Sequence, residues 1–477
     1  MMPFMKSLPK KIETIHCIAI CGMGMGSLAG LLKQAGYHVT GSDQNIYPPM
    51  SDQLKQLKIP VRAQYAPENI PQDVDLIVIG NAVSKNNVEV EEVLHRGLPY
   101  LSMPEACHHF FLKEKTSLVV AGTHGKTTTS SLLAWILYKL GRDPSFLIGG
   151  ILNNFEGAYR LGRGDEMVME GDEYDSAFFD KGPKFFHYNP KVLIITSLEY
   201  DHADIYHDMD SLRKNFKKLI QLVPQNGRWA ACIDFPEVAA LMKDYSGSLV
   251  TYSTQGRADY EARHIDIGES GTKFDLFIKG KFQASWVSPL IGSYNVANVL
   301  GALILLDYLE IPLSGIQGPL LEFRGVKRRQ EIRGIVKDRI VIDDFAHHPT
   351  AVRATLEGLK ARYPEYRLWA LFEPRSQTSR RRVFQDQFAE ALSLADKVLV
   401  APPYQVEKIP EEERLDPYQL CQKIKSLGKE ASLHSGVDSM VTQVVKESRA
   451  FDLIVIMSNG GFDGIYEKML EGLKELA

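Results

Sequence analysis

The residues between Ser117 and Gly141 constrain the fold of this chain more than any other segment. A short apolar run, Leu118 to Ala121, is typical of a buried strand. It leads into a glycine turn, residues 122–126, and then into an amphipathic helix that begins near Thr127. We expect this helix to end at Gly141, because glycine adopts a left-handed C-cap at the lowest cost. The sequence therefore predicts a strand, a turn and a helix in direct succession.

This strand, turn and helix form a candidate phosphate-binding loop. Backbone N–H groups and the positive end of the helix would face an anion, Lys126 can reach the β- and γ-phosphates of a nucleotide, and the Thr127 hydroxyl can ligate Mg²⁺. The usual eight-residue loop would have glycine at Val120, so this loop is a tighter variant. A chance glycine turn before a core helix is the alternative. The predicted ATP-binding residues of the loop are Gly122, Thr123, His124, Gly125, Lys126, Thr127 and Thr128.

Length and composition narrow the class of protein. At 477 residues, a prior of about 150 residues per domain predicts about three domains. The 55 basic and 59 acidic residues nearly balance, so neither nucleic acid nor a membrane is favoured as a partner. The five cysteines are scattered and contain no C-x-x-C pair, which indicates reduced, mostly buried thiols. No signal peptide and no run of about 18 apolar residues is present, and we expect a cytoplasmic protein.

Residues 15–43 repeat the order of strand, glycine turn, helix and strand. The turn contains Gly22 and Gly24, and Asp43 follows about twenty residues later, where a Rossmann βαβ unit places an acid against a ribose hydroxyl. NAD and another nucleotide are both open as the ligand of this unit. A second strand, Val74 to Ile79, leads into polar loops at residues 80–87 that are candidates for the same ligand or are ordinary loops.

Two further strands of the central region end in polar residues. The strand from Glu166 to Glu170 places an acid beside the phosphate loop, where nucleotide enzymes hold Mg²⁺ or its water. Glu170 is the better candidate, and the acids at positions 172, 173 and 175 are open to a reading as solvated turn residues. The strand from Val192 to Ser197 leads to His202, which is either structural or a contact to metal or phosphate.

The region from 226 to 290 alternates short β-like segments with turns and is predicted to form an antiparallel excursion. A helix then opens near Ser293, and Asn295 and Asn298 lie about one turn apart on it, as ligands or as helix caps. The basic cluster around Arg328 and Arg329 is either a solvated loop or an anion site.

A third α/β unit follows, with predicted strands at 339–343, 368–372, 397–401 and 452–457 and a helix at 351–362. Polar loops follow three of these strands, which suggests another ligand-binding edge. The loop from Asp343 to Thr350 could be read as a metal site, but its proline and tight spacing favour a turn with hydrogen-bonding side chains.

Taken together, the motifs resemble those of the Mur ligase family over essentially the whole chain. The motifs that carry the resemblance are GMGMG, AGTHGKTTT, EGDEYD, EYDHAD, SYNVANVLGA, GVKRRQE and DDFAHHPTA. The resemblance implies an ATP-dependent ligase that joins the tripeptide L-Ala-γ-D-Glu-meso-diaminopimelate to UDP-N-acetylmuramic acid in peptidoglycan recycling. Segments such as FFDK at 178–181 and Arg375-Ser376 favour this branch over the alternative, the relative that adds a single L-alanine in peptidoglycan biosynthesis.

The resemblance also implies roles for individual residues, with Mg²⁺ as cofactor and ATP as co-substrate. The metal ligands would be Thr127, Glu170 and His202, and catalysis would use Lys126, Glu170, His202, Arg328 and Arg329. UDP-sugar would bind at Gly22, Gly24, Ser42, Asp43, Asn81 and Ser84. Asn295, Asn298 and Asp344 would contact ATP, and His347, His348 and Arg375 would contact the peptide. Either histidine is a candidate base for the incoming amine. Lys217, at the place of a lysine that several relatives carbamylate, is treated as a surface residue.

The expected fold class is α/β with three domains. A Rossmann-like domain for the UDP-sugar spans 1–115, a P-loop ATPase-like domain with a mixed sheet spans 116–325, and a Rossmann-like domain for the ATP ribose and the incoming peptide spans 326–477. The expected partners are the three substrates, with the protein a monomer or homodimer. A dehydrogenase that uses the first glycine turn for NAD, and an ATP-sensing scaffold without chemistry, are the rival classes.

Overall fold

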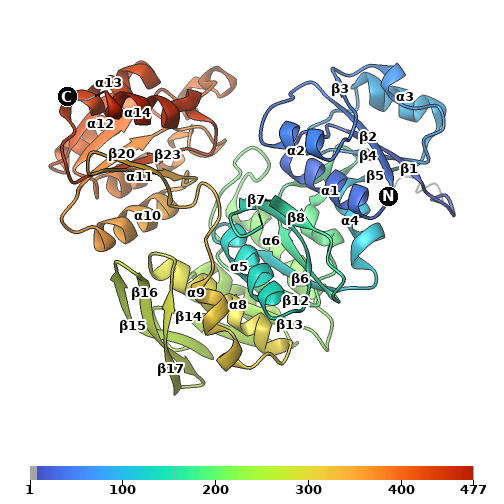
Figure 1. Cartoon of the computed structure of the whole chain (residues 1–477), viewed down its shortest axis with the longest axis horizontal. Helices are drawn as coiled ribbons and strands as arrows, with labels where there is room; N and C mark the ends of the chain where they lie inside the picture. The colour runs from blue at the N-terminus through green and yellow to red at the C-terminus, as the bar shows by residue number, and fades with distance from the viewer. Residues whose placement is uncertain (1–7, 156, 476–477) are drawn as a thin grey trace. The chain divides into compact units, whose positions relative to one another are not determined.

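The computed structural model describes residues 8–155 and 157–475, and the chain divides into two compact units. The first unit comprises Met1–Leu198, Arg213–Tyr252 and Val299–Phe323, and the second comprises Glu199–Leu212, Ser253–Asn298 and Arg324–Ala477. Figure 1 shows the helices and strands of both units.

The N-terminal sheet is parallel throughout, with strand order β3-β2-β1-β4-β5. Its strands are β1 (Thr14–Ile18), β2 (His38–Asp43), β3 (Val61–Ala63), β4 (Leu76–Ile79) and β5 (Tyr100–Ser102). Its helices are α1 (Met23–Gln34), α2 (Met50–Gln56), α3 (Val88–Arg96) and α4 (Met103–Cys107). The order of strands reverses between β1 and β4, and ligands of such sheets bind outside the carboxyl ends of strands at this switch point. The glycine turn after β1 and the polar loop after β4 both lie there, as the sequence predicts.

The rest of the first unit is built on the strands β14-β13-β12-β6-β9-β7-β8, in that order. These strands are β6 (Thr116–Ala121), β7 (Ser145–Leu152), β8 (Gly157–Arg160), β9 (Glu166–Gly171), β12 (Val192–Ile195), β13 (Arg228–Cys232) and β14 (Leu249–Ser253). All neighbours pair in parallel except β7 and β8. The predicted antiparallel arrangement is therefore wrong for β13 and β14. Helix α7 (Pro236–Leu241) lies between them in the chain, and such a crossover returns the next strand in parallel.

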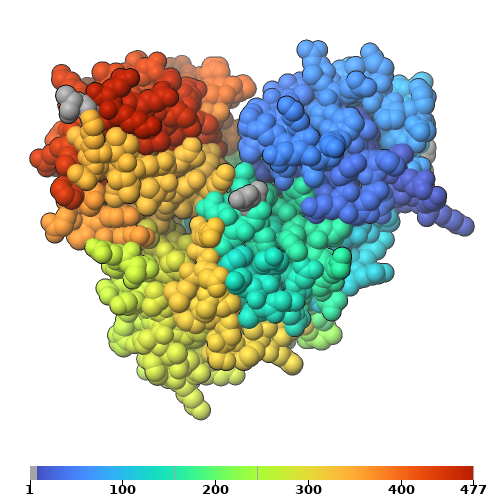
Figure 2. Space-filling view, viewed as in Figure 1, coloured from blue at the N-terminus to red at the C-terminus, as the bar shows by residue number. Residues whose placement is uncertain are grey.

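Helix α5 (Lys126–Lys139) follows the phosphate loop and ends before Gly141, whose φ of 76° is left-handed as predicted. The prediction that this helix is amphipathic is wrong, because every residue from Thr127 to Leu137 is buried. Part of the cover comes from α9 (Gln317–Leu321), where the Trp135 indole donates a hydrogen bond of 2.9 Å to the Pro319 carbonyl. Figure 2 shows the gold residues of this segment against the teal residues around α5. Helices α6 (Met209–Gln221) and α8 (Ser293–Tyr308) continue from one unit into the other.

The second unit contains an antiparallel group of three strands and a six-stranded sheet. The antiparallel group, β15 (Tyr260–Gly268), β16 (Gly271–Ile278) and β17 (Lys281–Ser288), is the part of the predicted excursion that is confirmed. The sheet has the order β18-β19-β23-β20-β21-β22, and only its edge strand β18 is antiparallel. Its strands are β18 (Glu331–Val336), β19 (Arg339–Asp344), β20 (Arg367–Phe372), β21 (Lys397–Val400), β22 (Glu430–Leu433) and β23 (Asp452–Met457).

Helices cover both faces of this C-terminal sheet. They are α10 (Pro349–Arg362), α11 (Gln385–Leu392), α12 (Pro417–Ser426), α13 (Val437–Glu447) and α14 (Ile465–Lys474). One core cluster contains Phe372 together with residues of α10, α11 and α12, and the other contains the adjacent Leu371 together with residues of α13 and α14. Adjacent residues of one strand thus point to opposite cores, which explains the continuous apolar runs of the central strands.

Two general features concern the described parts of the chain. All five cysteines are free and buried. Among the helices of residues 8–155 and 157–475, none combines the length and the apolar character that crossing a membrane requires.

Candidate functional site

The phosphate loop is held in place by the end of β12. Gly122 and Gly125 have positive φ values of 131° and 81°, and a Cβ atom on Gly122 would collide with the Thr196 hydroxyl. The Thr123 N–H donates to the Ser197 carbonyl at 3.1 Å, and the His124 N–H donates to the Ser197 hydroxyl at 2.7 Å. Only glycine fits the first position without strain, so the loop conformation is encoded by these residues.

Lys126 forms a buried ion pair with Glu173. Its Nζ lies 2.8 Å and 3.0 Å from the two carboxylate oxygens, and it also donates to the Gly122 carbonyl at 2.5 Å. Burial would lower the pKa of Lys126, but the carboxylates of Glu173, Asp172 and Glu170 outweigh it and raise the pKa above its usual value. The lysine is therefore charged at neutral pH. Glu173 is 2% exposed, so it is not the solvated turn acid that its sequence position suggested.

Glu170 lies at the end of β9, opposite Val120 of β6. Its carboxylate accepts a hydrogen bond of 3.0 Å from the Thr127 hydroxyl and one of 2.7 Å from the Gly149 N–H. A hydroxyl and a carboxylate side by side at a phosphate loop are the oxygen donors that Mg²⁺ prefers. These two residues thus fit a magnesium ion in their chemistry. His202 belongs to the other unit and has a left-handed φ of 56°.

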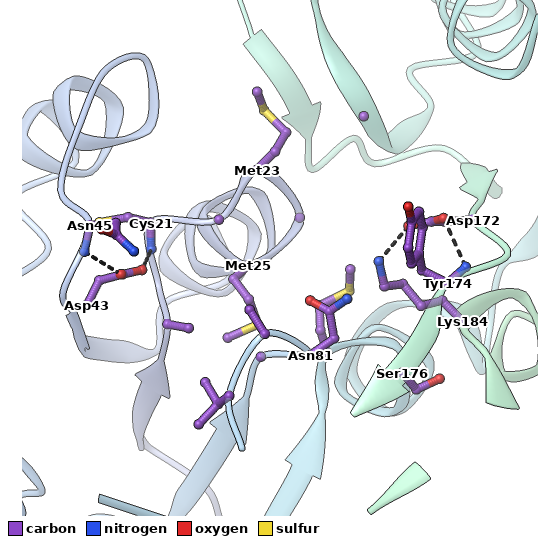
Figure 3. Close-up of a pocket in the computed structure, with 18 of the residues that line it drawn as sticks. Cys21, Met23, Met25, Asp43, Asn45, Asn81, Asp172, Tyr174, Ser176 and Lys184 are labelled. Carbon is purple, nitrogen blue, oxygen red and sulfur yellow. Dashed lines mark hydrogen bonds and ion pairs between the residues drawn. The ribbon is translucent and has the colours of Figure 1, made fainter. Parts of the chain in front are cut away.

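A single cavity of about 730 Å³ connects the first glycine turn with the phosphate loop (Figure 3). Five of the six predicted UDP-sugar residues line it, namely Gly22, Gly24, Asp43, Asn81 and Ser84. Lys126 and Glu170 line the same cavity, so the structure brings together two groups of residues that are far apart in the sequence. All of these residues belong to the first unit.

Ser42 and Asp43 have structural partners in the N-terminal sheet. The Asp43 carboxylate accepts hydrogen bonds of 2.9 Å from the Cys21 N–H and from the Asn45 N–H, which fixes the glycine turn (Figure 3). Ser42 is fully buried, does not line the cavity and donates its hydroxyl to Glu89. Ser42 thus ties β2 to α3.

Sequence reasoning missed the hairpin that forms one wall of the cavity. Strands β10 (Asp175–Ala177) and β11 (Asp180–Pro183) pair with each other, and the wall includes Asp172, Tyr174, Ser176 and Lys184. The only signal in the sequence was the FFDK segment at the tip of this hairpin. Its apolar residues indicate burial, but nothing in their spacing points to a cavity.

In the second unit, Asp344 lies at the end of β19 and is 4% exposed. Its carboxylate accepts hydrogen bonds of 2.8 Å from the Gln330 N–H and from the Ala346 N–H. Burial raises the pKa of Asp344, although Arg329 opposes this. The carboxylate therefore connects the turn before β18 to the loop after β19.

The two arginines of the basic cluster have different surroundings. Arg328 donates to the carbonyls of Ser458 and Gly460 at 2.7 Å each, and its Nε lies 3.3 Å from the Asp343 carboxylate. Both guanidinium groups lie over the Phe345 ring, with centroid distances of 5.3 Å for Arg328 and 4.8 Å for Arg329. Arg328 thus ties the loop after β23 to β19, and is not a solvated loop residue.

The loop from Asp343 to Thr350 is a turn with hydrogen-bonding side chains, as favoured from the sequence. His348 is 4% exposed and caps α10 by accepting from the Thr350 N–H at 3.3 Å. His347 Nε2 lies 3.8 Å from the Asp201 carboxylate, which also accepts from the Thr378 hydroxyl at 2.5 Å. Burial works to raise the pKa of Asp201, but His202, His347 and His348 outweigh it and lower that pKa. His202 and both candidate bases thus gather around Asp201.

The remaining candidates are Arg375, Asn295, Asn298 and Lys217. Arg375 lies 3.3 Å from the Glu373 carboxylate and 3.7 Å above the Tyr404 ring centroid. Asn295 is 5% exposed and donates to the Ile291 carbonyl at 2.8 Å, and Asn298 donates to the Asn295 side chain at 3.0 Å. These bonds connect the first turns of α8 to the segment before the helix. Lys217 is half-buried on α6.

Comparisons with known proteins cover nearly the whole chain. Three family descriptions match in succession: "Mur ligase family, catalytic domain" at residues 14–115, "Mur ligase middle domain" at 120–306 and "Mur ligase, glutamate ligase domain" at 328–460. The UDP-N-acetylmuramate–L-alanyl-γ-D-glutamyl-meso-2,6-diaminoheptandioate ligase of Escherichia coli is 38% identical over 468 residues, which are 97% of this chain and 99% of that protein. The UDP-N-acetylmuramate–L-alanine ligase of Lachnoclostridium phytofermentans is 31% identical over 469 residues, 96% and 97% of the two chains.

Two solved structures of ligases match the fold of this chain. A murein peptide ligase from Psychrobacter arcticus is 34% identical and matches with a TM-score of 0.71 over 98% of this chain and 99% of that one. The UDP-N-acetylmuramate–alanine ligase of Thermotoga maritima is 26% identical, with a TM-score of 0.79 over 96% and 98%. The expected α/β fold is confirmed by these matches. The chain therefore belongs to the Mur ligase family and is an ATP-dependent ligase that forms a carbon–nitrogen bond.

Proposed function

We propose that this enzyme joins the tripeptide L-alanyl-γ-D-glutamyl-meso-diaminopimelate to UDP-N-acetylmuramic acid in peptidoglycan recycling. The observation that carries the proposal is the continuous cavity between the first glycine turn and Lys126. A sugar nucleotide whose diphosphate lies at the glycine turn would extend its carboxylate toward the phosphate loop. The relatives of 38% and 36% identity that carry out this reaction by name cover 97% of the chain, which supports the choice of peptide.

The carboxylate of the sugar must first be activated, because an amine cannot displace an oxygen of a carboxylate, which is a very poor leaving group. The lactyl carboxylate of the sugar attacks the γ-phosphorus of ATP, which forms an acyl phosphate and releases ADP. The free amine of the tripeptide then attacks the acyl carbon, loses a proton and displaces inorganic phosphate. Negative charge accumulates on phosphoryl oxygens in both steps, so positioning and electrostatic stabilisation supply most of the rate.

The residues of the chain fit these roles. Lys126 would hold the phosphates with the N–H groups of the loop, and Thr127, Glu170 and His202 would hold Mg²⁺, which neutralises phosphate charge when bound. Asn295, Asn298, Asp344 and an arginine of the Arg328–Arg329 pair would bind the nucleotide. Arg375 would bind a carboxylate of the peptide through its planar guanidinium, and His347 or His348 would accept the proton of the amine. In this proposal the three domains span 1–115, 116–325 and 326–477.

The alternative is a UDP-N-acetylmuramate–L-alanine ligase, because proteins of that name also match nearly the whole chain at 30–32% identity. Incubation with ATP, Mg²⁺, UDP-N-acetylmuramic acid and either the tripeptide or L-alanine separates the two. A product with the mass of the tripeptide adduct supports the proposal. A product with L-alanine alone would favour the alternative, and ATP hydrolysis that is independent of the sugar nucleotide would contradict both.

A further inference from the structure

The hairpin beside the cavity is anchored at its tip. Phe178 and Phe179 at its tip pack against the core of the N-terminal sheet, and the Phe179 ring lies 5.0 Å from that of Tyr100. Next to the tip, the His187 ring nitrogen lies 2.6 Å from the carboxylate of Asp180, which pairs with Ala177. Side chains that this hairpin directs into the cavity are therefore held in fixed positions.

Lys184 is the residue that follows the hairpin, and it lines the cavity. Its N–H donates to the Tyr174 carbonyl at 3.0 Å, and its Nζ lies 2.5 Å from the Asp172 carboxylate (Figure 3). The side chain is 13% exposed, although it carries a charge. The contact with the Asp172 carboxylate thus fixes the position of the lysine ammonium group.

Lys184 is one of the two cationic residues among the described residues that line the cavity. Among the described residues that line the cavity, the cationic ones are Lys126 and Lys184, and Lys126 belongs to the phosphate loop. A sugar nucleotide with an acidic side chain brings a carboxylate in addition to its diphosphate. An ammonium group has three N–H donors, and the hydrogen bond to Asp172 takes one of them.

The position of Lys184 favours the carboxylate over the diphosphate. The glycine turn and the start of α1 provide backbone N–H groups for a diphosphate on the N-terminal side of the cavity. Lys184 comes from the opposite wall, where its partner Asp172 is two residues beyond Glu170. It therefore lies on the wall where the acid must meet the phosphoryl group.

We propose that Lys184, held by Asp172, binds the carboxylate of the acidic sugar nucleotide and retains it as the acyl phosphate forms. This inference rests on the proposed function, since it assumes that a sugar-borne acid is the phosphoryl acceptor. Lys184 thereby selects sugar nucleotides that carry this acid.

Calorimetric titration of Lys184→Met with two probes tests the inference. UDP-N-acetylmuramic acid carries the lactyl carboxylate, and UDP-N-acetylglucosamine lacks it but has the same diphosphate. We expect the variant to bind UDP-N-acetylmuramic acid about tenfold more weakly, since a charge-assisted hydrogen bond is lost, and UDP-N-acetylglucosamine within about twofold of wild type. Lys181→Met is the matched control, because Lys181 is in the same hairpin with its side chain 71% exposed, and it should change neither affinity.

Equal weakening of both ligands by Lys184→Met, or no weakening of either, would overturn the inference. Thermal unfolding checks that the variant is folded, and Lys184→Gln, which keeps a polar side chain, gives the same comparison if the methionine variant is not. Lys184→Arg should restore part of the preference for the acidic ligand, because it restores the charge. If wild-type protein fails to bind UDP-N-acetylmuramic acid at all, the proposed function fails, which is a different result from any that the variants give.

Discussion

Replacement of Lys126 by methionine separates the structural from the catalytic role of the phosphate loop. The substitution keeps the length of the side chain but removes its charge, and it leaves Glu173, 2% exposed, with a carboxylate that has lost two contacts of 2.8 Å and 3.0 Å. Removing one partner of a buried ion pair costs about 3 to 5 kcal/mol. We therefore expect the first unit of Lys126→Met to unfold at clearly lower temperature and urea concentration than wild type.

A second substitution distinguishes the two roles. In Lys126→Met with Glu173→Leu the buried charge is gone as well, so most of the lost stability should return. Activity should stay lost in both variants, by at least about 10²- to 10³-fold in kcat, because transition-state charge has lost its donor. Binding of UDP-N-acetylmuramic acid should remain close to wild type, since the glycine turn is unchanged.

The assays are unfolding followed by circular dichroism, phosphate release and calorimetric titration of the sugar nucleotide. Lys139→Met is the matched control, because Lys139 lies near the end of the same helix and its 2.7 Å ion pair with Glu322 is partly exposed. It should cost no more than about 1 kcal/mol and leave turnover intact. Turnover of Lys126→Met within tenfold of wild type, or stability equal to wild type, would refute the reasoning.

Three further predictions concern other parts of the chain. His16 is fully buried, and burial lowers its pKa from 6.5 to about 4 although the Glu89 carboxylate is 4.0 Å away. Between these two pH values only the unfolded chain takes up the proton. The free energy of unfolding should therefore be unaffected by His16 above pH 6.5 and should fall by about 3 kcal/mol in total as the pH drops to about 4. Urea unfolding between pH 7 and pH 4 measures this, and His16→Gln should have a shallower pH dependence. Glu170→Gln should require several-fold more Mg²⁺ than wild type for half-maximal turnover. Excess EDTA should abolish turnover in the variant and in wild type. An unchanged magnesium titration would count against Glu170 as a ligand. Arg375→Lys should raise the KM for the tripeptide about tenfold and leave the KM for ATP unchanged, since a bidentate carboxylate contact is lost; an unchanged peptide KM removes Arg375 from the peptide site.

The elements near the phosphate loop could be predicted from the sequence because several local signals agree there. Apolar runs of four to six residues predict β6, β12 and β23. Helix α3 is bounded by residues typical of helix ends, with Asn87 at its N-cap and Gly97 at its C-cap. The pairing of β13 with β14 could not be predicted in the same way. Whether neighbouring strands run parallel depends on the path of the chain between them, which local periodicity does not encode.

Candidate site residues could be predicted from the sequence when they follow a recognisable strand. They could not be predicted when their contacts are with residues far away in the sequence. Lys126 and Glu170 were found because each stands next to a recognisable strand end. Glu173 and Lys184 were missed for different reasons. The sequence left Glu173 open to a reading as a solvated turn residue, and Lys184 carries no motif of its own. Their partners, Lys126 and Asp172, are 47 and 12 residues away in sequence, so only the folded chain pairs them.

Transfer of ¹⁸O tests the central claim most directly, namely that the γ-phosphoryl group of ATP is transferred to the acid of the sugar nucleotide. UDP-N-acetylmuramic acid labelled with ¹⁸O in both lactyl carboxylate oxygens is incubated with ATP, Mg²⁺, the tripeptide and wild-type enzyme, and the inorganic phosphate is analysed by mass spectrometry. An acyl phosphate intermediate predicts one ¹⁸O atom in each released phosphate, because the bridging oxygen leaves with the phosphorus. Unlabelled phosphate together with normal formation of the amide product would contradict the account.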